Sequence, residues 1–314
     1  MPTYSVVVPV YNSEKSLEIL YARVRDVFDN IICRPFELIL VDDCSKDSSF
    51  MIICELTKKD SRVKGIQLAL NHGQQKAVLC GMNYASGDFI VTMDDDLQHP
   101  PEEIPKLIAK MESSNNYDVV IGEYDRKKHG PIRKFGSALM NLSNNIIYKK
   151  PKELKMTSFR LIRRKVVDNL LRINVNKPMV GMLLLQTTSR IVNTEVQHDP
   201  RQFGRSGYSF GKLVNAFFTN LMTNSDLPLV AISWIGIFSM FASVILIFKY
   251  IILYFIRGTS IQGWTSSVVL LLFFGGMILF AMGIIGRYLT NIMQEAKKYP
   301  SFMIRQEISK DKKD

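Results

Sequence analysis

Two long stretches in the C-terminal part of the chain, residues 227–248 and 258–286, contain no charged residue. About 20 apolar residues are enough for a helix to cross the hydrocarbon core of a bilayer. The stretches therefore predict a transmembrane region of two helices over residues 227–289, joined by a short loop. The chain is therefore expected to combine a polar domain with a membrane region.

The charges around these stretches predict their orientation. The short loop between them is nearly free of Lys and Arg, whereas residues 290–314 form a basic tail. Cytoplasmic segments of membrane proteins are enriched in Lys and Arg. We therefore expect a protein of the cell (inner) membrane whose large N-terminal domain and C-terminal tail both face the cytoplasm.

Residues 206–226 predict an amphipathic juxtamembrane segment. Between Phe210 and Met222 the apolar residues recur at alternating three- and four-residue spacing, which places them on one face of a helix. Such a helix could pack on the preceding domain. Its position directly before a predicted span favours a helix that lies in the membrane interface.

The first 205 residues show short apolar runs that alternate with helical periodicity. Predicted strands cover residues 5–10, 37–42, 63–68, 88–93, 118–122 and 190–198, and predicted helices cover residues 17–27, 51–59, 75–85, 102–113, 137–148 and 163–172. This alternation predicts an α/β domain, doubly wound around a mostly parallel sheet. In such sheets ligands bind beyond the carboxyl ends of the strands.

The charge balance narrows the partners. A net charge of +11 suits nucleic acid, anionic lipid or a small phosphorylated substrate. The sequence carries no zinc-finger or RNA-binding signature, so we expect no nucleic acid partner. The four cysteines form no C-x-x-C pair, which favours free thiols over a disulfide or metal framework.

A run of three carboxylates follows the fourth predicted strand. Asp94, Asp95 and Asp96 would repel one another unless a cation lies between them. Mg²⁺ and Mn²⁺ prefer oxygen ligands and commonly bridge protein oxygens to substrate phosphates. At the edge of an α/β sheet, the run predicts a divalent-metal site rather than a solvated acidic turn.

The other strand ends are suited to a nucleotide. Tyr11 can offer a ring face to a base, and Asp42 or Glu14 can accept hydrogen bonds from uracil or ribose. Residues 71–74 precede a helix whose N-terminus would favour phosphate. The sequence contains neither the phosphate-binding loop of kinases nor the glycine fingerprint of dinucleotide-binding enzymes, which disfavours both classes.

These motifs resemble the inverting family 2 glycosyltransferases of GT-A fold. Within that family they are similar to the polyprenyl-phosphate branch, which includes dolichol-phosphate mannose synthase, bactoprenol glucosyltransferase and undecaprenyl-phosphate aminoarabinose transferase. The resemblance rests on residues 8–12, 41–45, 73–74, 93–103, 133–137, 157–160 and 204–208. It implies transfer of a sugar from a nucleotide sugar, UDP being favoured over GDP, to a polyprenyl (undecaprenyl) phosphate. Because related enzymes form tetramers, a homo-tetramer is a further expectation.

The resemblance also implies roles for single residues. The donor nucleotide would be held by Pro9, Tyr11, Glu14, Asp42, Gln74, Asp94 and Asp95, the role of Asp95 remaining open. Metal ligands would be Asp94, Asp96 and Gln98. The acceptor phosphate would meet Arg133 and Ser137.

The expected chemistry follows from charge. A phosphate monoester carries about −1.5 to −2 charges at pH 7 and needs little help from a general base. It needs positioning and relief of repulsion from the donor diphosphate. Basic side chains can position it, and the candidates are Arg126, Arg133, Arg160, Arg201 and Arg205. We expect Asp96, Arg133 and Arg160 to be catalytic, with in-line attack inverting the anomeric carbon.

Two alternatives share parts of this pattern. A processive polysaccharide synthase has the same donor domain but usually carries a Gln-x-x-Arg-Trp motif, which this sequence lacks. A non-catalytic membrane scaffold could retain an inactive transferase fold, although Asp94, Asp96 and Gln98 are all present. Lipid-dependent release of nucleotide from a nucleotide sugar would distinguish these classes.

Overall fold

The structure, a computed structural model, describes residues 1–124, 153–173, 175, 178–200, 227–257, 263–296, 300 and 302–309. The chain forms two compact units. The first contains Met1–Gly130, Tyr148–Gly207 and Tyr299–Asp314, and the second contains Pro131–Ile147 and Tyr208–Lys298. The first unit therefore takes in the C-terminal residues, which follow the second unit in the sequence.

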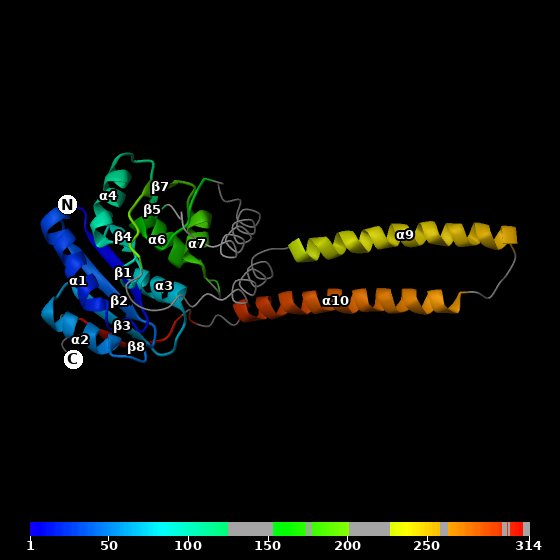
Figure 1. Cartoon of the computed structure of the whole chain (residues 1–314), viewed down its shortest axis with the longest axis horizontal. Coiled ribbons are helices and arrows are strands. Elements are labelled where there is room, and N and C mark those ends of the chain that lie inside the picture. Colours follow the sequence, from blue (N-terminus) through cyan, green and yellow to red (C-terminus); the bar gives the residue numbers. More distant parts are fainter. Residues whose placement is uncertain are drawn as a thin grey trace. The chain divides into compact units, whose positions relative to one another are not determined.

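The first unit is built on an eight-stranded sheet with the strand order β7-β5-β6-β4-β1-β2-β3-β8 (Figure 1). The strands are β1 Tyr4–Val10, β2 Phe36–Asp42, β3 Val63–Leu68, β4 Phe89–Thr92, β5 Val119–Glu123, β6 Arg160–Arg163, β7 Ile191–Glu195 and β8 Ile304–Ile308. The central strands β4, β1, β2 and β3 are parallel, and β7 is parallel to β5. β6 and β8 run antiparallel to their neighbours. The centre of this mixed sheet is the doubly wound core that the sequence predicts.

Helices cover both faces of the sheet, and each face has its own hydrophobic core. Successive strand residues point to opposite faces, so Val6 and Val8 of β1 enter one core and Val7 enters the other. The helices on the first face are α1 Leu17–Asp26 with a π-helical continuation Val27–Ile32, α2 Ser49–Lys59, and α4 Ile104–Glu112 after the short turn Pro101–Glu103. Those on the second face are α3 Gln74–Tyr84, α6 Arg164–Leu171 and α7 Val180–Thr187.

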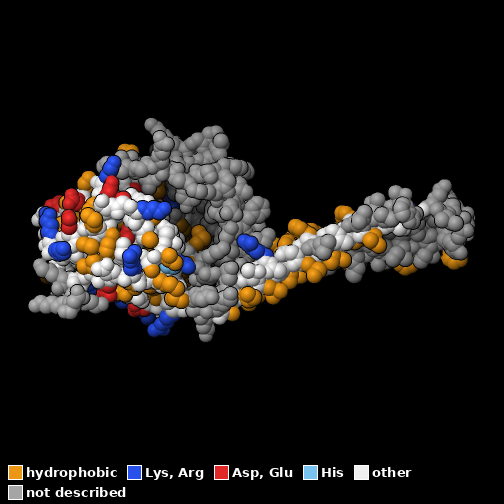
Figure 2. Space-filling view, turned by 90° about the horizontal axis from the view of Figure 1, so that it is seen from below, with side chains coloured by type: hydrophobic (Ala, Val, Ile, Leu, Met, Phe, Trp, Pro, Cys, Tyr) orange, Lys and Arg blue, Asp and Glu red, His pale blue; other side chains and the backbone are white. Residues whose placement is uncertain are grey.

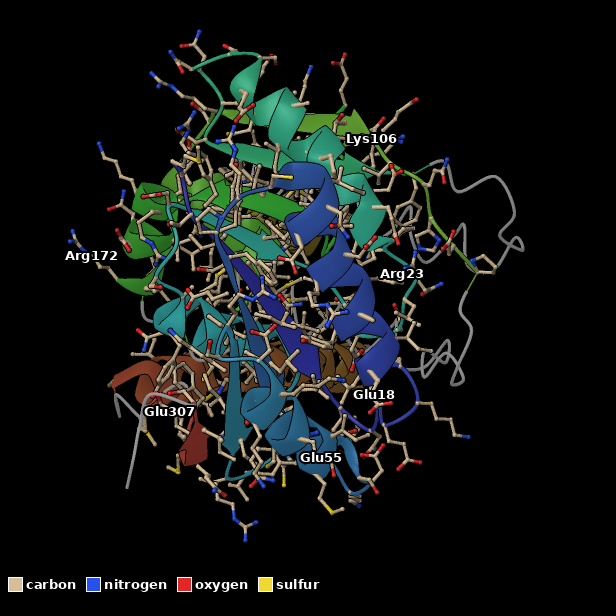
Figure 3. All side chains as sticks on the ribbon, turned by 90° about the vertical axis from the view of Figure 1, so that its left-hand side faces the viewer. Glu18, Arg23, Glu55, Lys106, Arg172 and Glu307 are labelled. Atoms are coloured by element: carbon tan, nitrogen blue, oxygen red, sulfur yellow. The ribbon has the colours of Figure 1, made fainter. Side chains whose placement is uncertain are left out.

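The helices of this unit are amphipathic. Leu17, Leu20 and Val24 of α1 are fully buried, whereas charged side chains such as Glu18 and Lys106 lie on the outer surface (Figure 3). Burial of one apolar stripe against the sheet is the main stabilisation available to such short helices.

The packing of α3 on the sheet depends on Gly81. A Cβ atom at this position would lie 2.3 Å from Val7 Cγ1 and 3.1 Å from Val41 Cγ2. Interiors are close-packed, so an added methyl group here would push α3 away from β1. Because α3 begins at Gln74, this contact also positions one of the predicted site residues.

Three elements of the first unit were not predicted from the sequence. β6 has only four residues with an arginine at each end, and α7 shows no polar face that would mark a surface helix. β8 lies within the predicted basic tail, residues 290–314, and pairs with β3. The C-terminal residues that the sequence assigned to a separate tail therefore include a strand of the first unit. β8 carries three consecutive polar residues, Arg305, Gln306 and Glu307, which resemble a solvated tail in the sequence, and its partner strand β3 is distant along the chain.

The second unit contains two long helices that lie side by side (Figure 1). These are α9 Leu227–Arg257, with 31 residues, and α10 Trp264–Ala296, with 33 residues. Large apolar side chains on both are exposed, and Figure 2 shows them along the visible face of the unit. Within the described residues one window, Phe273–Thr290, is long and apolar enough to cross a membrane. The predicted amphipathic segment over residues 206–226 lies outside the described residues.

Candidate active site

A cavity of about 370 Å³ lies at the carboxyl edge of the sheet. Parallel strands deliver their following residues to the same edge, so segments far apart in sequence meet there. The lining comes from the ends of β1, β2 and β4 and from the start of α3. Its residues are Pro9, Val10, Tyr11, Asp43, Asn71, Gly73, Gln74, Asp94, Asp95 and Asp96.

Asp94 is held by side chains from two other elements. Gln74 Nε2 donates a hydrogen bond to Asp94 Oδ1 at 2.6 Å. Ser158 Oγ donates to Asp94 Oδ2 at 2.7 Å. These bonds fix the carboxylate at the cavity wall while leaving lone pairs on both oxygens for a further ligand.

Asp95 has a different environment from Asp94. Its carboxylate accepts a hydrogen bond from the backbone N–H of Tyr11 at 3.1 Å and another from the Ser13 hydroxyl. Burial raises the pKa of the Asp95 carboxyl to about 6, and the nearby charges of Asp94 and Asp96 act in the same direction. Asp95 also lines the cavity, and its side chain joins the turn after β4 to the loop after β1.

Asp96 lies in a tight turn whose shape depends on the next residue. Leu97 has a positive φ of 60°, a conformation unfavourable for side chains other than glycine. Its side chain is fully buried in the core, which offsets that cost and anchors the turn. The backbone N–H of Gln98 donates to Asp96 Oδ1 at 3.1 Å, and the Gln98 carbonyl accepts a bond from the Asp199 N–H at 3.0 Å.

The donor set fits a hard divalent cation in its chemistry. Asp94 and Asp96 both line the cavity, and carboxylate oxygens are the ligands that Mg²⁺ and Mn²⁺ prefer. Gln98 is not among the lining residues. Within the part of the chain that the structure describes, no three His, Cys, Asp or Glu side chains gather into a ready metal cluster. A cation here would therefore take some of its ligands from a substrate.

The structure places Asp43, rather than Asp42, on the cavity wall. Asp42 is fully buried and accepts hydrogen bonds from Gln67 Nε2 at 3.3 Å and from the Ser45 N–H at 3.2 Å. Asp43 accepts bonds from the backbone N–H groups of His72 at 2.7 Å and Gly73 at 2.8 Å. Burial raises the pKa of the Asp43 carboxyl, and these two bonds oppose the shift.

The remaining predicted donor residues divide into two groups. Pro9 and Tyr11 line the cavity, and the Tyr11 side chain is about half exposed, so its ring is available to a base. Glu14 lies outside the lining, where its carboxylate accepts a bond from the Ser48 N–H at 3.1 Å. The sequence reasoning missed Asn71 and Gly73, although both fall in the loop that it assigned to phosphate.

Two buried nitrogen-bearing side chains, Arg160 and His99, lie near Asp94. Arg160 is almost fully buried, its Nε has no hydrogen-bond partner, and burial lowers the pKa of the guanidinium to about 10 against the attraction of Asp94. His99 stacks on Phe159 with ring centroids 5.4 Å apart, and its Nδ1 lies 4.0 Å from Asp94 Oδ2. Burial lowers the pKa of His99, against the attraction of Asp94 and Asp96. Sequence reasoning identified Arg160 but gave His99 no role.

The predicted acceptor-binding residues cannot be placed in the same way. Arg126, Arg133, Ser137, Arg201 and Arg205 lie outside the described residues. Their assignment to the acceptor phosphate stays a prediction.

An acid-lined cavity at the carboxyl edge of a doubly wound sheet is the arrangement of a nucleotide-binding α/β enzyme. A family model described as Glycosyl transferase family 2 matches residues 5–171. The chain belongs to this family, and it is a glycosyltransferase. The predicted family and enzyme class are thereby confirmed.

Sequence similarity to other proteins extends over nearly the whole chain. An uncharacterized glycosyltransferase of Bacillus subtilis (strain 168), YkcC, is 34% identical over 305 residues, which are 96% of this chain and 93% of the relative. An undecaprenyl-phosphate 4-deoxy-4-formamido-L-arabinose transferase of Proteus mirabilis (strain HI4320) is 33% identical over 304 residues, covering 96% and 92%. The likeness therefore includes the long helices as well as the sheet domain.

Solved structures support the fold. A mycobacterial protein superposes with a TM-score of 0.53 at 18% identity, covering 71% of this chain and 74% of that one. The glucosyl-3-phosphoglycerate synthase of Mycobacterium tuberculosis, in complex with Mn²⁺, uridine diphosphate and phosphoglyceric acid, superposes with a TM-score of 0.52 at 17% identity, covering 70% and 76%. At these identities the likeness shows the GT-A fold alone.

Proposed function

We propose that this glycosyltransferase moves a sugar from a UDP-sugar to undecaprenyl phosphate at the cytoplasmic face of the cell membrane, with inversion at the anomeric carbon. One observation carries the proposal. Relatives that are 31–33% identical over 96–97% of this chain bear the name undecaprenyl-phosphate 4-deoxy-4-formamido-L-arabinose transferase. The product would be a lipid-linked monosaccharide for modification of cell-envelope glycans or lipids.

The donor is assigned to the acid-lined cavity. The Tyr11 ring is exposed for stacking on a base, and Asp43 on the facing wall can accept hydrogen bonds from a nucleoside. Asp94 and Asp96 would hold Mg²⁺ or Mn²⁺, which, when bound, would neutralise charge on the donor diphosphate and stabilise the leaving group. Gln74 and Ser158 keep Asp94 in place for this role.

The acceptor needs a cationic clamp rather than a general base. Its phosphate is already anionic at neutral pH, so the chain has to position it and offset its repulsion from the donor. Arg133 and Ser137 are the proposed first contacts, supported by Arg126, Arg201 and Arg205. Arg160, buried behind Asp94, contributes a fixed positive charge at the same edge of the sheet.

The two long helices would provide the membrane anchor. α9 and α10 expose large apolar side chains along their length, which is costly in water and favourable in lipid. At about 1.5 Å per residue, each is long enough to cross a bilayer. A lipid phosphate keeps its head at the membrane surface, so an anchored catalytic domain meets its acceptor without leaving the membrane. The proposed homo-tetramer can be examined on the detergent-solubilised protein by light scattering.

The test uses the full chain in detergent or nanodiscs. A panel of UDP- and GDP-sugars is incubated with undecaprenyl phosphate and Mn²⁺ or Mg²⁺, and nucleotide release and lipid-linked product are measured. We expect release from a UDP-sugar that depends on both lipid and metal, and its loss in Asp96→Asn. A polymeric product would instead identify a processive synthase, and no lipid-dependent turnover with any donor would identify a scaffold.

A further inference from the structure

The C-terminal segment that contains β8 is hydrogen-bonded, just before the strand, to the loop that forms one wall of the donor cavity. β8 pairs antiparallel with β3, with Gly65 opposite Ile308 and Leu68 opposite Ile304. Just before β8, the Met303 carbonyl accepts a hydrogen bond from the Ala69 N–H at 2.8 Å. Residues that follow the long helices thus continue the sheet beyond the end of β3, where the cavity loop begins.

A side chain of this loop makes the second bond. His72 Nε2 accepts a hydrogen bond from the backbone N–H of Met303 at 3.3 Å. Residues 69–73 are therefore attached to the C-terminal segment at both ends, through Ala69 and through the His72 imidazole. Figure 3 shows Glu307 of β8 at the outer edge of the sheet, so no further strand lies beyond it to replace these bonds within the described residues.

The opposite side of the same loop faces the cavity. The backbone N–H groups of His72 and Gly73 donate to the two oxygens of Asp43, and Asn71 Nδ2 donates to the Asp43 carbonyl at 3.1 Å. Gly73, with a φ of 87°, is the N-cap of α3. The next residue, Gln74, bonds Asp94. The loop thus lies between β8 on one side and two acidic wall residues on the other.

These contacts have a structural cost if β8 is lost. β3 would become an edge strand with unpaired backbone groups, and Phe302, which packs against the core of the α3 face, would leave it. The loop would keep its bonds to Asp43 but lose both outer attachments. A five-residue loop held on one side samples more conformations, and ligand binding would have to order it again.

We propose that the C-terminal strand is part of the donor site and that His72 is a positioning residue, which holds the Asp43 wall through its bond from Met303. The donor cavity is then complete only after the chain beyond α10 has folded back onto the sheet. Donor binding would thereby depend on synthesis of the whole membrane anchor. The inference rests on the proposed function in one respect, namely that the cavity takes a nucleoside diphosphate.

The experiment compares four variants of the full chain in detergent: His72→Ala, His72→Gln, a deletion of residues 302–314, and Arg305→Ala. Arg305 lies exposed on β8 and serves as the matched control. The readouts are the UDP dissociation constant with Mn²⁺, the donor KM and kcat, and amide hydrogen exchange of residues 69–74. Loss of one neutral hydrogen bond changes an equilibrium by about two- to tenfold.

We expect His72→Ala to raise the UDP dissociation constant and the donor KM about two- to tenfold, with kcat nearly unchanged and faster exchange in residues 69–74. His72→Gln, whose amide oxygen can accept the Met303 bond, should recover most of the affinity. The deletion should raise the UDP dissociation constant and the donor KM more than His72→Ala does, and Arg305→Ala should have wild-type values.

Wild-type affinity and exchange rates in both His72→Ala and the deletion would overturn the inference. A fall in kcat at unchanged KM would also overturn it, because a merely structural role lowers the amount of active enzyme rather than its affinity. Failure of the wild type itself to bind UDP contradicts the proposed function instead. The exchange measurement then still decides whether β8 orders the loop.

Discussion

Replacing Asp95 tests whether this carboxylate has a structural role that differs from the metal-binding role proposed for Asp94 and Asp96. Asp95 accepts hydrogen bonds from the Tyr11 N–H and the Ser13 hydroxyl, whereas Asp94 and Asp96 have other partners. In Asp95→Asn the amide oxygen can still accept both bonds. In Asp95→Ala both bonds are lost and the loop after β1 is released. Both variants remove the negative charge, so they differ only in whether the hydrogen bonds to Tyr11 and Ser13 remain.

The magnitudes follow from the bonds. A hydrogen bond to a charged group contributes about 1.5–3 kcal/mol and a neutral one about 0.5–1.5 kcal/mol. Water can replace Asp95 at the exposed Tyr11 N–H, so we expect Asp95→Ala to lower the unfolding free energy by about 2 kcal/mol. In Asp95→Asn the hydrogen bonds are weaker, but the neutral amide is not repelled by Asp94 and Asp96 and costs less free energy to bury than a carboxylate. The expected loss is below about 1 kcal/mol.

The assay is denaturant unfolding together with donor KM and metal dependence of nucleotide release. Release of Tyr11 in Asp95→Ala should raise the donor KM about tenfold, equivalent to about 1.4 kcal/mol. Asp95→Asn should keep the wild-type metal dependence and a KM within about threefold of wild type. If Asp95→Asn abolished metal-dependent turnover as completely as Asp96→Asn, then Asp95 would be a ligand and the structural interpretation would be refuted.

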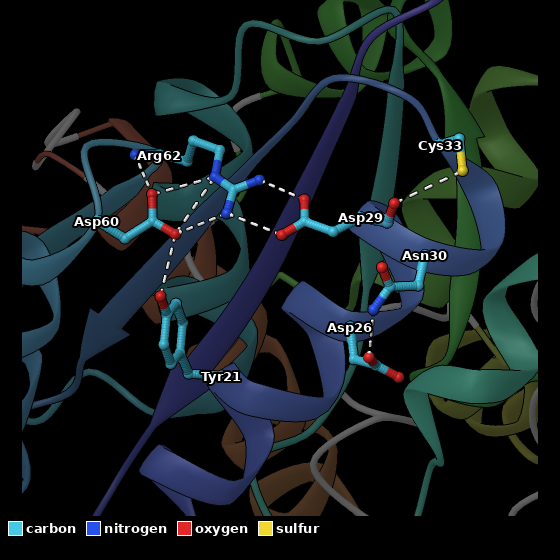
Figure 4. A network of polar contacts seen from close by, with 7 residues as sticks. All are labelled: Tyr21, Asp26, Asp29, Asn30, Cys33, Asp60 and Arg62. Atoms are coloured by element: carbon cyan, nitrogen blue, oxygen red, sulfur yellow. Dashed lines mark hydrogen bonds and ion pairs between the residues drawn. The ribbon is translucent and has the colours of Figure 1, made fainter.

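Three further substitutions test other parts of the structure. Asp96→Asn should lower kcat/KM about 100-fold or more without a change in thermal unfolding, measured over a Mn²⁺ titration. Gly81→Ala places a Cβ 2.3 Å from Val7 Cγ1 and should lower the free energy of denaturant unfolding by about 1–3 kcal/mol. The double variant Gly81→Ala/Val7→Ala should lose less stability than the sum of the two single variants, because Val7→Ala removes the atom that the new Cβ would meet. Arg62→Ala removes the ion pairs of Figure 4 and should cost about 1–2 kcal/mol at pH 7. Hydrogen bonding from Arg62 lowers the pKa of Asp60 to about 2. The stabilisation by this ion pair is therefore fully present above about pH 4 and is lost as the pH falls through about 2. Between these pH values the unfolding free energy of Arg62→Ala should change less with pH than that of the wild type.

Local patterns in the sequence were sufficient for the central sheet. Apolar runs that end in polar residues identified the strands β1 to β5, because the residues of each strand are mostly buried. β8 shows why the same reasoning fails at the edge. Its residues are half polar, and its assignment as a strand depends on pairing with β3, which no local pattern reveals. The predicted tail was wrong for this reason.

The same limit applies to single residues of the site. Sequence reasoning placed Pro9, Tyr11, Gln74 and the three aspartates at one edge, and the structure brings them to one cavity. It assigned the nucleotide contact to Asp42. Asp42 and Asp43 follow the same apolar run, and the sequence does not show which of them faces the cavity. Adjacent residues at a strand end point in opposite directions, and the direction that faces the cavity depends on how β2 registers with its neighbours.

The acidic run at β4 follows a related rule. Adjacent carboxylates repel one another, so a stable arrangement gives each its own donors and its own direction. Asp94 is bonded by side chains from α3 and from the segment before β6, Asp95 by the loop after β1, and Asp96 by the backbone of its own turn. The donors to the three carboxylates lie at different sequence separations from the run. A run of three identical residues therefore acquires three different environments from its contacts, and only substitutions that preserve those contacts can report on the chemistry of the cavity.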